Sequence, residues 1–149
     1  MSTSTAPTAP PHTPTSRLAG RLPEIILSIA RVIVGLLFVQ HGAQKLLGWF
    51  ADPSMPARQI PVGSMPWIAG VLELVGGVLI ALGLFTRPVA FLLAGEMAVA
   101  YFMAHAPQSF WPIVNKGEVA VLFCFAFLLF WSHGPGPYSL DALRRRGRA

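Results

Sequence analysis

The stretch IILSIARVIVGLLFVQHGAQKLLGWF, residues 25–50, decides the fold. It is a long apolar run, yet it carries the basic residues Arg31, His41 and Lys45. A helix of roughly 17–25 apolar residues crosses a bilayer. Ionisable groups inside hydrocarbon are costly, so they usually face the interior of a helix bundle and pair there. We therefore expect a membrane helix whose basic side chains meet partners on other helices.

Three further apolar runs extend this interpretation to the whole chain, because each carries one carboxylate. The four expected spans are Ile25–Phe50, Pro66–Phe85 with Glu73, Pro88–His105 with Glu96, and Gly117–Trp131 with Glu118. Of the 149 residues, 54% are hydrophobic and only 11% are charged, whereas soluble domains have about 25% charged residues. The runs lack the period-two alternation of a membrane barrel. The predicted fold is an all-α membrane protein, a bundle of four transmembrane helices.

The flanking charges predict how this bundle is oriented. Threading four helices places most arginines at one end: Arg17, Arg21, Arg87, Arg144, Arg145, Arg146 and Arg148. Since basic residues mark the cytoplasmic side, we expect both termini in the cytoplasm. A cleaved signal peptide is disfavoured, because the first run is too long and no small-residue cleavage site follows it.

Composition divides the chain into three parts. Residues 1–22 form a Ser/Thr/Pro-rich tail that we expect to be disordered. Residues 23–133 form the membrane domain, and residues 134–149 form a basic cytoplasmic tail. The arginines of this last tail would favour an anionic lipid surface, but a simple role in setting topology explains them equally well.

Helical spacing places the basic residues of the first run on one face. That face carries Arg31, Gly35, Phe38, Gly42 and Lys45, at steps of three and four residues. Its two glycines would let a neighbouring helix approach closely. A matching face on the second run contains Gly70, Glu73, Gly77 and Leu84. These two faces are expected to pack together.

Depth along the helices predicts two polar clusters. With a rise of about 1.5 Å per residue, Arg31 and Glu96 lie at similar depth near the inner end, where they would form a structural ion pair. An outer cluster of His41, Gln44, Lys45 and Glu73 would bind a ligand. Plainer interpretations stay open, since Lys45 would also reach the outer surface by snorkelling and His41 would also serve as a neutral interior histidine.

The sequence also argues against several kinds of site. It contains no P-loop, no dinucleotide fingerprint and no clustered Cys/His pattern, so we expect no metal site. Haem is disfavoured, because the candidate ligands His41 and His105 differ in estimated depth. Cys124 is the only cysteine, so an internal disulfide is excluded and a buried, unreactive thiol is expected.

Three motifs resemble the DoxX family of small membrane proteins. The first is Arg31-x3-Gly35-x2-Phe38-x3-Gly42-x2-Lys45, ending in Gly48-Trp49-Phe50. The second is Glu73-x2-Gly76-Gly77-x5-Gly83-x2-Thr86-Arg87-Pro88, and the third is Gly134-Pro135-Gly136-x2-Ser139-Leu140-Asp141. The resemblance spans about residues 31–141. It implies a four-helix inner-membrane protein whose relatives include membrane subunits of quinone-linked oxidoreductases and members of oxidative-stress complexes, but it transfers no catalytic residue.

These observations lead to three functional hypotheses. The first is a membrane subunit of a redox module, in which the outer cluster binds a quinone headgroup or a small oxyanion and Glu73 relays a proton. The second is a non-catalytic anchor or assembly factor, in which the charges fix helix packing. The third is a small proton-coupled transporter, although four helices are few for alternating access. The expected partners are the lipid bilayer and a redox enzyme, with homo-oligomerisation left open and no nucleic acid.

Overall fold

The computed structural model describes residues 14–50 and 60–147, with residues 14–19 described through their backbone alone. Within these ranges the chain is helical and contains no strand. The helical segments are α1 (Pro14–Leu47), α2 (Met65–Leu82), α3 (Thr86–Ala100), the π-helix η1 (Tyr101–His105), α4 (Pro112–Asn115), α5 (Glu118–His133) and α6 (Leu140–Arg146). The predicted all-α class is confirmed.

Three helical stretches are long and apolar enough to cross a bilayer. They are Gly20–Leu47, Met65–Leu82 and Thr86–His105, the last of which combines α3 and η1. The helix α5 is also apolar but has 16 residues, which corresponds to a length of about 24 Å. A hydrocarbon core is about 30 Å thick. Three of the four predicted spans therefore meet the length criterion, and α5 is a shorter apolar helix.

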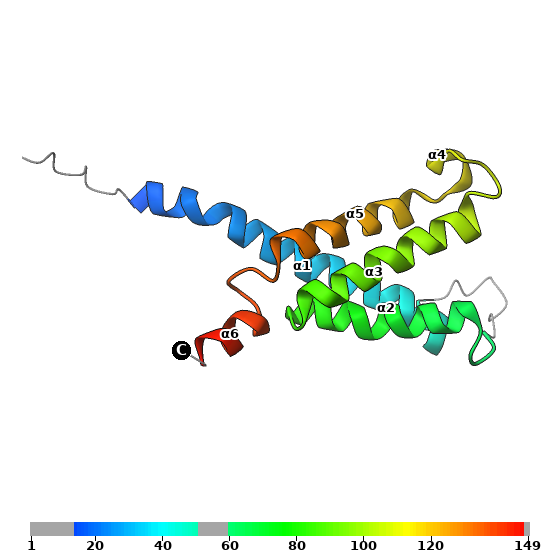
Figure 1. The fold of residues 1–149 in the computed structure, drawn as a ribbon, viewed down its shortest axis with the longest axis horizontal. Coiled ribbons are helices and arrows are strands. Elements are labelled where there is room, and N and C mark those ends of the chain that lie inside the picture. Colours follow the sequence, from blue (N-terminus) through cyan, green and yellow to red (C-terminus); the bar gives the residue numbers. More distant parts are fainter. Residues whose placement is uncertain (1–13, 51–59, 148–149) are drawn as a thin grey trace, which may run out of the picture.

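The helices pack in two pairs that lie side by side. α1 packs along α2, α3 packs along α5, and α2 joins the two pairs through α3 (Figure 1). The short helix α6 lies at the end of the bundle where α2 turns into α3, and α4 lies at the opposite end (Figure 1).

The start of α1 differs from the predicted domain boundary. Residues 1–22 were expected to form a disordered tail, but α1 begins at Pro14 and continues through Pro23. Proline is well tolerated in the first turn of a helix, and the following residues include the good helix formers Leu18, Ala19 and Arg21. The helix therefore begins inside the segment that composition predicted to be disordered. Residues 1–13 of the predicted tail lie outside the described residues.

The bundle has charged groups inside and apolar groups outside. Arg31 and Glu73 are 1% and 3% exposed, whereas Ile26 is 62% exposed and Leu122 is 70% exposed. The interior also contains Phe38, whose ring centroid lies 4.8 Å from that of Phe127. Large apolar side chains facing outward require an apolar surrounding, so this distribution is that of a protein embedded in lipid.

Glycine residues bring α1 and α2 into backbone contact, as their spacing predicts. A Cβ atom added at Gly35 would lie 2.6 Å from the backbone nitrogen of Ala81, and one added at Gly42 would lie 2.4 Å from that of Leu74. On the facing helix, a Cβ atom at Gly77 would lie 2.8 Å from the carbonyl oxygen of Gly35. Without a hydrophobic driving force in lipid, such close packing is a main source of helix association.

Candidate functional site

An ion pair joins α1 to α2 inside the bundle. The Nζ atom of Lys45 lies 2.5 Å from the Oε1 atom of Glu73. The Glu73 side chain is 4% exposed and the Lys45 side chain is 33% exposed. Lys45 is one helical turn beyond Gly42, so the glycine contact that brings the two backbones together also brings these two charges together. The structure thus brings together two of the four residues in the predicted outer cluster.

Glu96 of α3 adds a second carboxyl group to this pair. Its carboxyl group lies within electrostatic range of Glu73 and Lys45. Both oxygens of Glu96 and the Oε2 atom of Glu73 are buried and have no hydrogen-bond partner among the described residues. Buried polar atoms are normally satisfied, so three unsatisfied acceptors in one region are unusual. This region can accept hydrogen bonds from a ligand or hold a proton.

Among the described residues, the other two members of the predicted outer cluster form no hydrogen bond or ion pair with Lys45 or Glu73. Gln44 is exposed, and its Nε2 atom donates to the carbonyl oxygen of Phe50 at 3.2 Å. His41 is exposed, and its ring lies edge-on to that of Phe123, with centroids 5.6 Å apart. Sequence reasoning grouped all four residues by depth, whereas Gln44 lies on another side of α1 than the neighbouring Lys45. The Glu96 carboxyl group, which was assigned to the inner pair, belongs here instead.

Arg31 does not pair with Glu96, so the predicted inner ion pair is wrong. Its Nη1 atom donates to the carbonyl oxygens of Ile80 at 2.5 Å and Ala81 at 2.7 Å, and its Nη2 atom donates to that of Tyr138 at 2.8 Å. The last carbonyl groups of a helix lack partners within the helix, and a planar guanidinium group can donate to several of them at once. Arg31 therefore caps the C-terminal end of α2.

The turn after α2 leaves room for this arginine. Gly83 has a φ of 69°, and its N–H and that of Leu84 donate to Ile80 and Leu79 in a Schellman motif. A Cβ atom at Gly83 would lie 2.7 Å from the Nη1 atom of Arg31. A glycine after an apolar run is a sequence signal for the end of a helix. The carbonyl groups just before such a glycine are where an arginine of another helix can bind.

Asp141 joins the C-terminal segment to the same turn. Its Oδ1 and Oδ2 atoms accept hydrogen bonds from the backbone N–H groups of Phe85 at 3.0 Å and Thr86 at 2.9 Å. Partial burial opposes ionisation, but these N–H groups outweigh it and lower the pKa of Asp141 below its ordinary value. Residues 134–149 were expected to form a basic cytoplasmic tail. Tyr138 and Asp141 instead pack on the bundle, because they satisfy the backbone groups at two helix ends.

A second polar group surrounds the π-helix at the opposite end of the bundle. The Nδ1 atom of His105 lies 3.0 Å from the carbonyl oxygen of Asn115. The buried Asn115 side chain donates to the Ser109 carbonyl oxygen at 2.6 Å and accepts from the Gly117 N–H at 2.7 Å. The Tyr101 hydroxyl donates to the carbonyl oxygen of Phe110. These contacts fix the connection from η1 to α5 and leave few free groups for a ligand.

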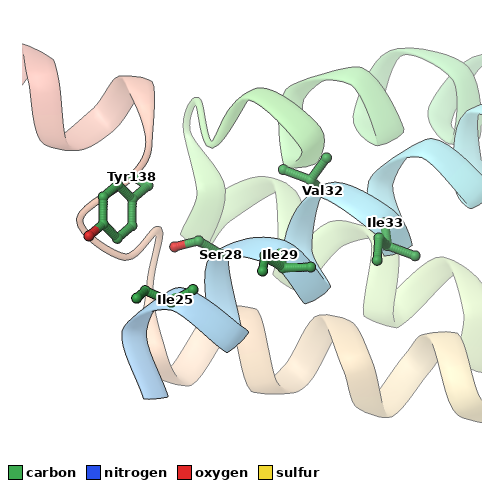
Figure 2. A pocket seen from close by; sticks show the side chains of 6 residues that line it. All are labelled: Ile25, Ser28, Ile29, Val32, Ile33 and Tyr138. Atoms are coloured by element: carbon green, nitrogen blue, oxygen red, sulfur yellow. The ribbon is translucent and has the colours of Figure 1, made fainter. Parts of the chain in front are cut away.

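An open groove on the described surface lies apart from the ion pair. It has a volume of about 510 Å³ and is lined by Ile25, Ser28, Ile29, Val32, Ile33 and Tyr138 (Figure 2). The Ser28 hydroxyl already donates to the Glu24 carbonyl oxygen at 2.8 Å. Specific ligand sites combine apolar walls with convergent polar groups, and this groove has almost none. We regard it as part of the lipid-facing surface.

The fold and this site define a class: a helical membrane protein with a charged and partly unsatisfied interior. The family model described as DoxX matches residues 26–106, which is 81 of the 149 residues. The chain belongs to the DoxX family, as the three motifs indicated.

Relatives in several bacteria support this membership. A Haemophilus influenzae protein named "Uncharacterized protein" is 43% identical, and the match covers 77% of this chain and 87% of that one. The Escherichia coli protein named "Inner membrane protein YqjF" is 30% identical over 83% of this chain and 95% of its own. A Bacillus subtilis protein named "Putative oxidoreductase CatD" is 35% identical over 48% of this chain and 53% of its own. No solved structure matches the chain.

Proposed function

We propose that this DoxX-family protein is the membrane subunit of a redox module and that Lys45, Glu73 and Glu96 bind the headgroup of a quinone. The single observation behind this proposal is the set of three buried carboxyl oxygens without a partner among the described residues, next to the Lys45–Glu73 pair. The name of the Bacillus subtilis relative, "Putative oxidoreductase CatD", also supports a role in oxidation and reduction. Apolar helices around a few polar groups suit a lipid-soluble ring.

The charge balance favours a quinone over a small oxyanion. Lys45 is already neutralised by Glu73 at 2.5 Å, so no spare positive charge faces the site from these residues. The unsatisfied atoms are hydrogen-bond acceptors, and a hydroquinone offers two hydroxyl donors to them. A quinone reduced by two electrons also takes up two protons, and a carboxyl group in contact with it can donate or accept one. We propose that the electrons come from a soluble partner enzyme.

A short-chain hydroquinone should bind the purified protein, and Glu73→Gln should weaken this binding at least about tenfold, because a hydrogen bond to a charged group contributes about 1.5–3 kcal/mol. Glu96→Gln should weaken it as well. Quenching of tryptophan fluorescence during titration measures the affinity. Gln44→Ala is the matched control, since Gln44 lies at similar depth but faces another side. Equal affinity in Glu73→Gln, Glu96→Gln and Gln44→Ala would rule out this site.

A non-catalytic anchor is the second candidate, and one observation favours it. The two Nη atoms of Arg31 and the carboxylate of Asp141 bind backbone groups of the bundle itself, so much of the ionic pattern fixes packing. An anchor would co-purify with its enzyme, bind no hydroquinone, and support normal activity of that enzyme after Glu73→Gln. Retained partner activity together with absent hydroquinone binding would therefore select the anchor over the quinone site.

We also propose that α5 crosses the membrane and that both termini are cytoplasmic. Packing along α3 would let this 16-residue helix span with its ends held by the surrounding protein. Arg87 is in the first turn of α3, and α6, which carries three arginines, lies at the same end of the bundle (Figure 1). Basic residues favour the cytoplasmic side. An alkaline phosphatase fused after residue 149 should be inactive, and the same enzyme inserted at Gly63 should be active. An active C-terminal fusion would exclude this topology.

A further inference from the structure

A basic pocket lies where the C-terminal helix α6 meets the turn between α2 and α3. It has a volume of about 360 Å³ and is lined by Phe85, Thr86, Arg87, Pro88, Pro135, Asp141, Arg144 and Arg145. Its three arginines come from two segments that are far apart in the sequence. None of the three forms an ion pair with another described residue. The pocket therefore holds guanidinium groups with donors left for a ligand.

The single carboxylate in the pocket does not use these donors. Both oxygens of Asp141 are already bound to the backbone N–H groups of Phe85 and Thr86. Arg144 lies over the ring of Phe85 at 5.1 Å from its centroid, which holds the guanidinium group at the pocket. Arginine recognises phosphate groups through paired donors, so the pocket suits a phosphate ester.

An aromatic surface adjoins the pocket along α3 and α5. Arg87 donates to the carbonyl oxygen of Ser132 at 3.2 Å. Phe91 lies one turn after Arg87 on α3, and Trp131 directly precedes Ser132 on α5. The ring centroids of Phe91 and Trp131 lie 5.6 Å apart, and the two residues are 60% and 45% exposed. Tryptophan favours the boundary between headgroups and acyl chains. The arginines thus lie at headgroup level, with an apolar surface directly below them.

We propose that this pocket binds the headgroup of an anionic phospholipid, whose acyl chains lie along Phe91 and Trp131. A free phosphate would use the arginines but not the aromatic surface, whereas a lipid uses both. Leu140 and Leu143 of α6 are 37% and 59% exposed, so this short helix also offers apolar side chains to the bilayer surface. Bound lipid would hold α6 in place and, through Asp141, hold the turn between α2 and α3.

The test is the thermal stability of the purified full-length chain in an uncharged detergent. Short-chain phosphatidylglycerol should raise the apparent melting temperature, whereas phosphatidylcholine and inorganic phosphate should not. Arg144→Gln/Arg145→Gln should weaken phosphatidylglycerol binding by about 25-fold, taking about fivefold for each arginine near an anionic surface. Arg146→Gln is the matched control for the single variant Arg145→Gln, because Arg146 is on the same helix but does not line the pocket.

Three outcomes would contradict the proposal. Equal stabilisation by inorganic phosphate would identify a site for a free anion. Stabilisation by phosphatidylglycerol that Arg145→Gln and Arg146→Gln reduce to the same extent would indicate a general attraction between basic residues and an anionic surface. Stabilisation that is unchanged in the double variant would place the lipid elsewhere. A double variant with the wild-type melting temperature in the absence of lipid shows that the bundle is intact.

Discussion

Lys45→Met should lower the free energy of unfolding by about 3 kcal/mol, because it leaves the Glu73 carboxyl group buried without its partner. Breaking a buried ion pair typically costs about 3–5 kcal/mol. The lower end applies here, since a third of the Lys45 side chain is exposed. Unfolding in mixed detergent, followed by circular dichroism, measures the change. Lys116→Met is the control, because Lys116 is exposed and forms no ion pair among the described residues.

The double variant Lys45→Met/Glu73→Gln separates packing from ligand binding. Replacing both members of a buried pair is often nearly neutral for stability, so most of the lost stability should return. Hydroquinone binding should not return, because the acceptor at Glu73 is gone. If Lys45→Met were as stable as Lys116→Met, the ion pair would contribute nothing to the fold. If the double variant bound hydroquinone normally, the pair would be structural alone.

The sequence predicted the packing of α1 on α2 more accurately than it predicted the polar contacts. Helical periodicity fixes which residues share a face, so Gly35, Gly42 and Gly77 could be assigned to the interface from spacing alone. The same periodicity brought Lys45 and Glu73 together. Depth is also a simple function of position along a helix. These features depend on one or two helices at a time, which explains why sequence reasoning could reach them.

Contacts among three or more segments were not predictable in this way. Arg31 and Glu96 lie at comparable estimated depths, and opposite charges suggested a pair. In the structure the arginine binds carbonyl groups of α2 and of the C-terminal segment. Its choice of partner depends on where α2 ends and on the return of residues 134–141 to the bundle, which spacing does not reveal. The direction of the Gln44 side chain around α1 can be calculated from the helical period, but Gln44 was grouped by its depth along the helix alone.

Gly42→Ala should lower the free energy of unfolding by about 2–3 kcal/mol, as expected for overpacking a tight contact. The added Cβ atom would lie 2.4 Å from the backbone nitrogen of Leu74 and 2.7 Å from the carbonyl oxygen of Gly70. Backbone atoms of a helix cannot rotate out of the way as a side chain can, so α1 and α2 would have to separate. Unfolding in mixed detergent again measures the loss.

Gly95→Ala is the matched control for this substitution. Gly95 lies inside α3, and a Cβ atom there would meet nothing within 4 Å, so alanine should leave stability unchanged or raise it by up to about 1 kcal/mol. Because Lys45 lies one turn beyond Gly42, separating the helices should also draw its amine away from Glu73 and weaken hydroquinone binding. Equal stability of the two variants would mean that α1 and α2 are not in backbone contact. A destabilised Gly42→Ala variant with normal hydroquinone affinity would mean that ligand binding does not depend on the spacing between these helices.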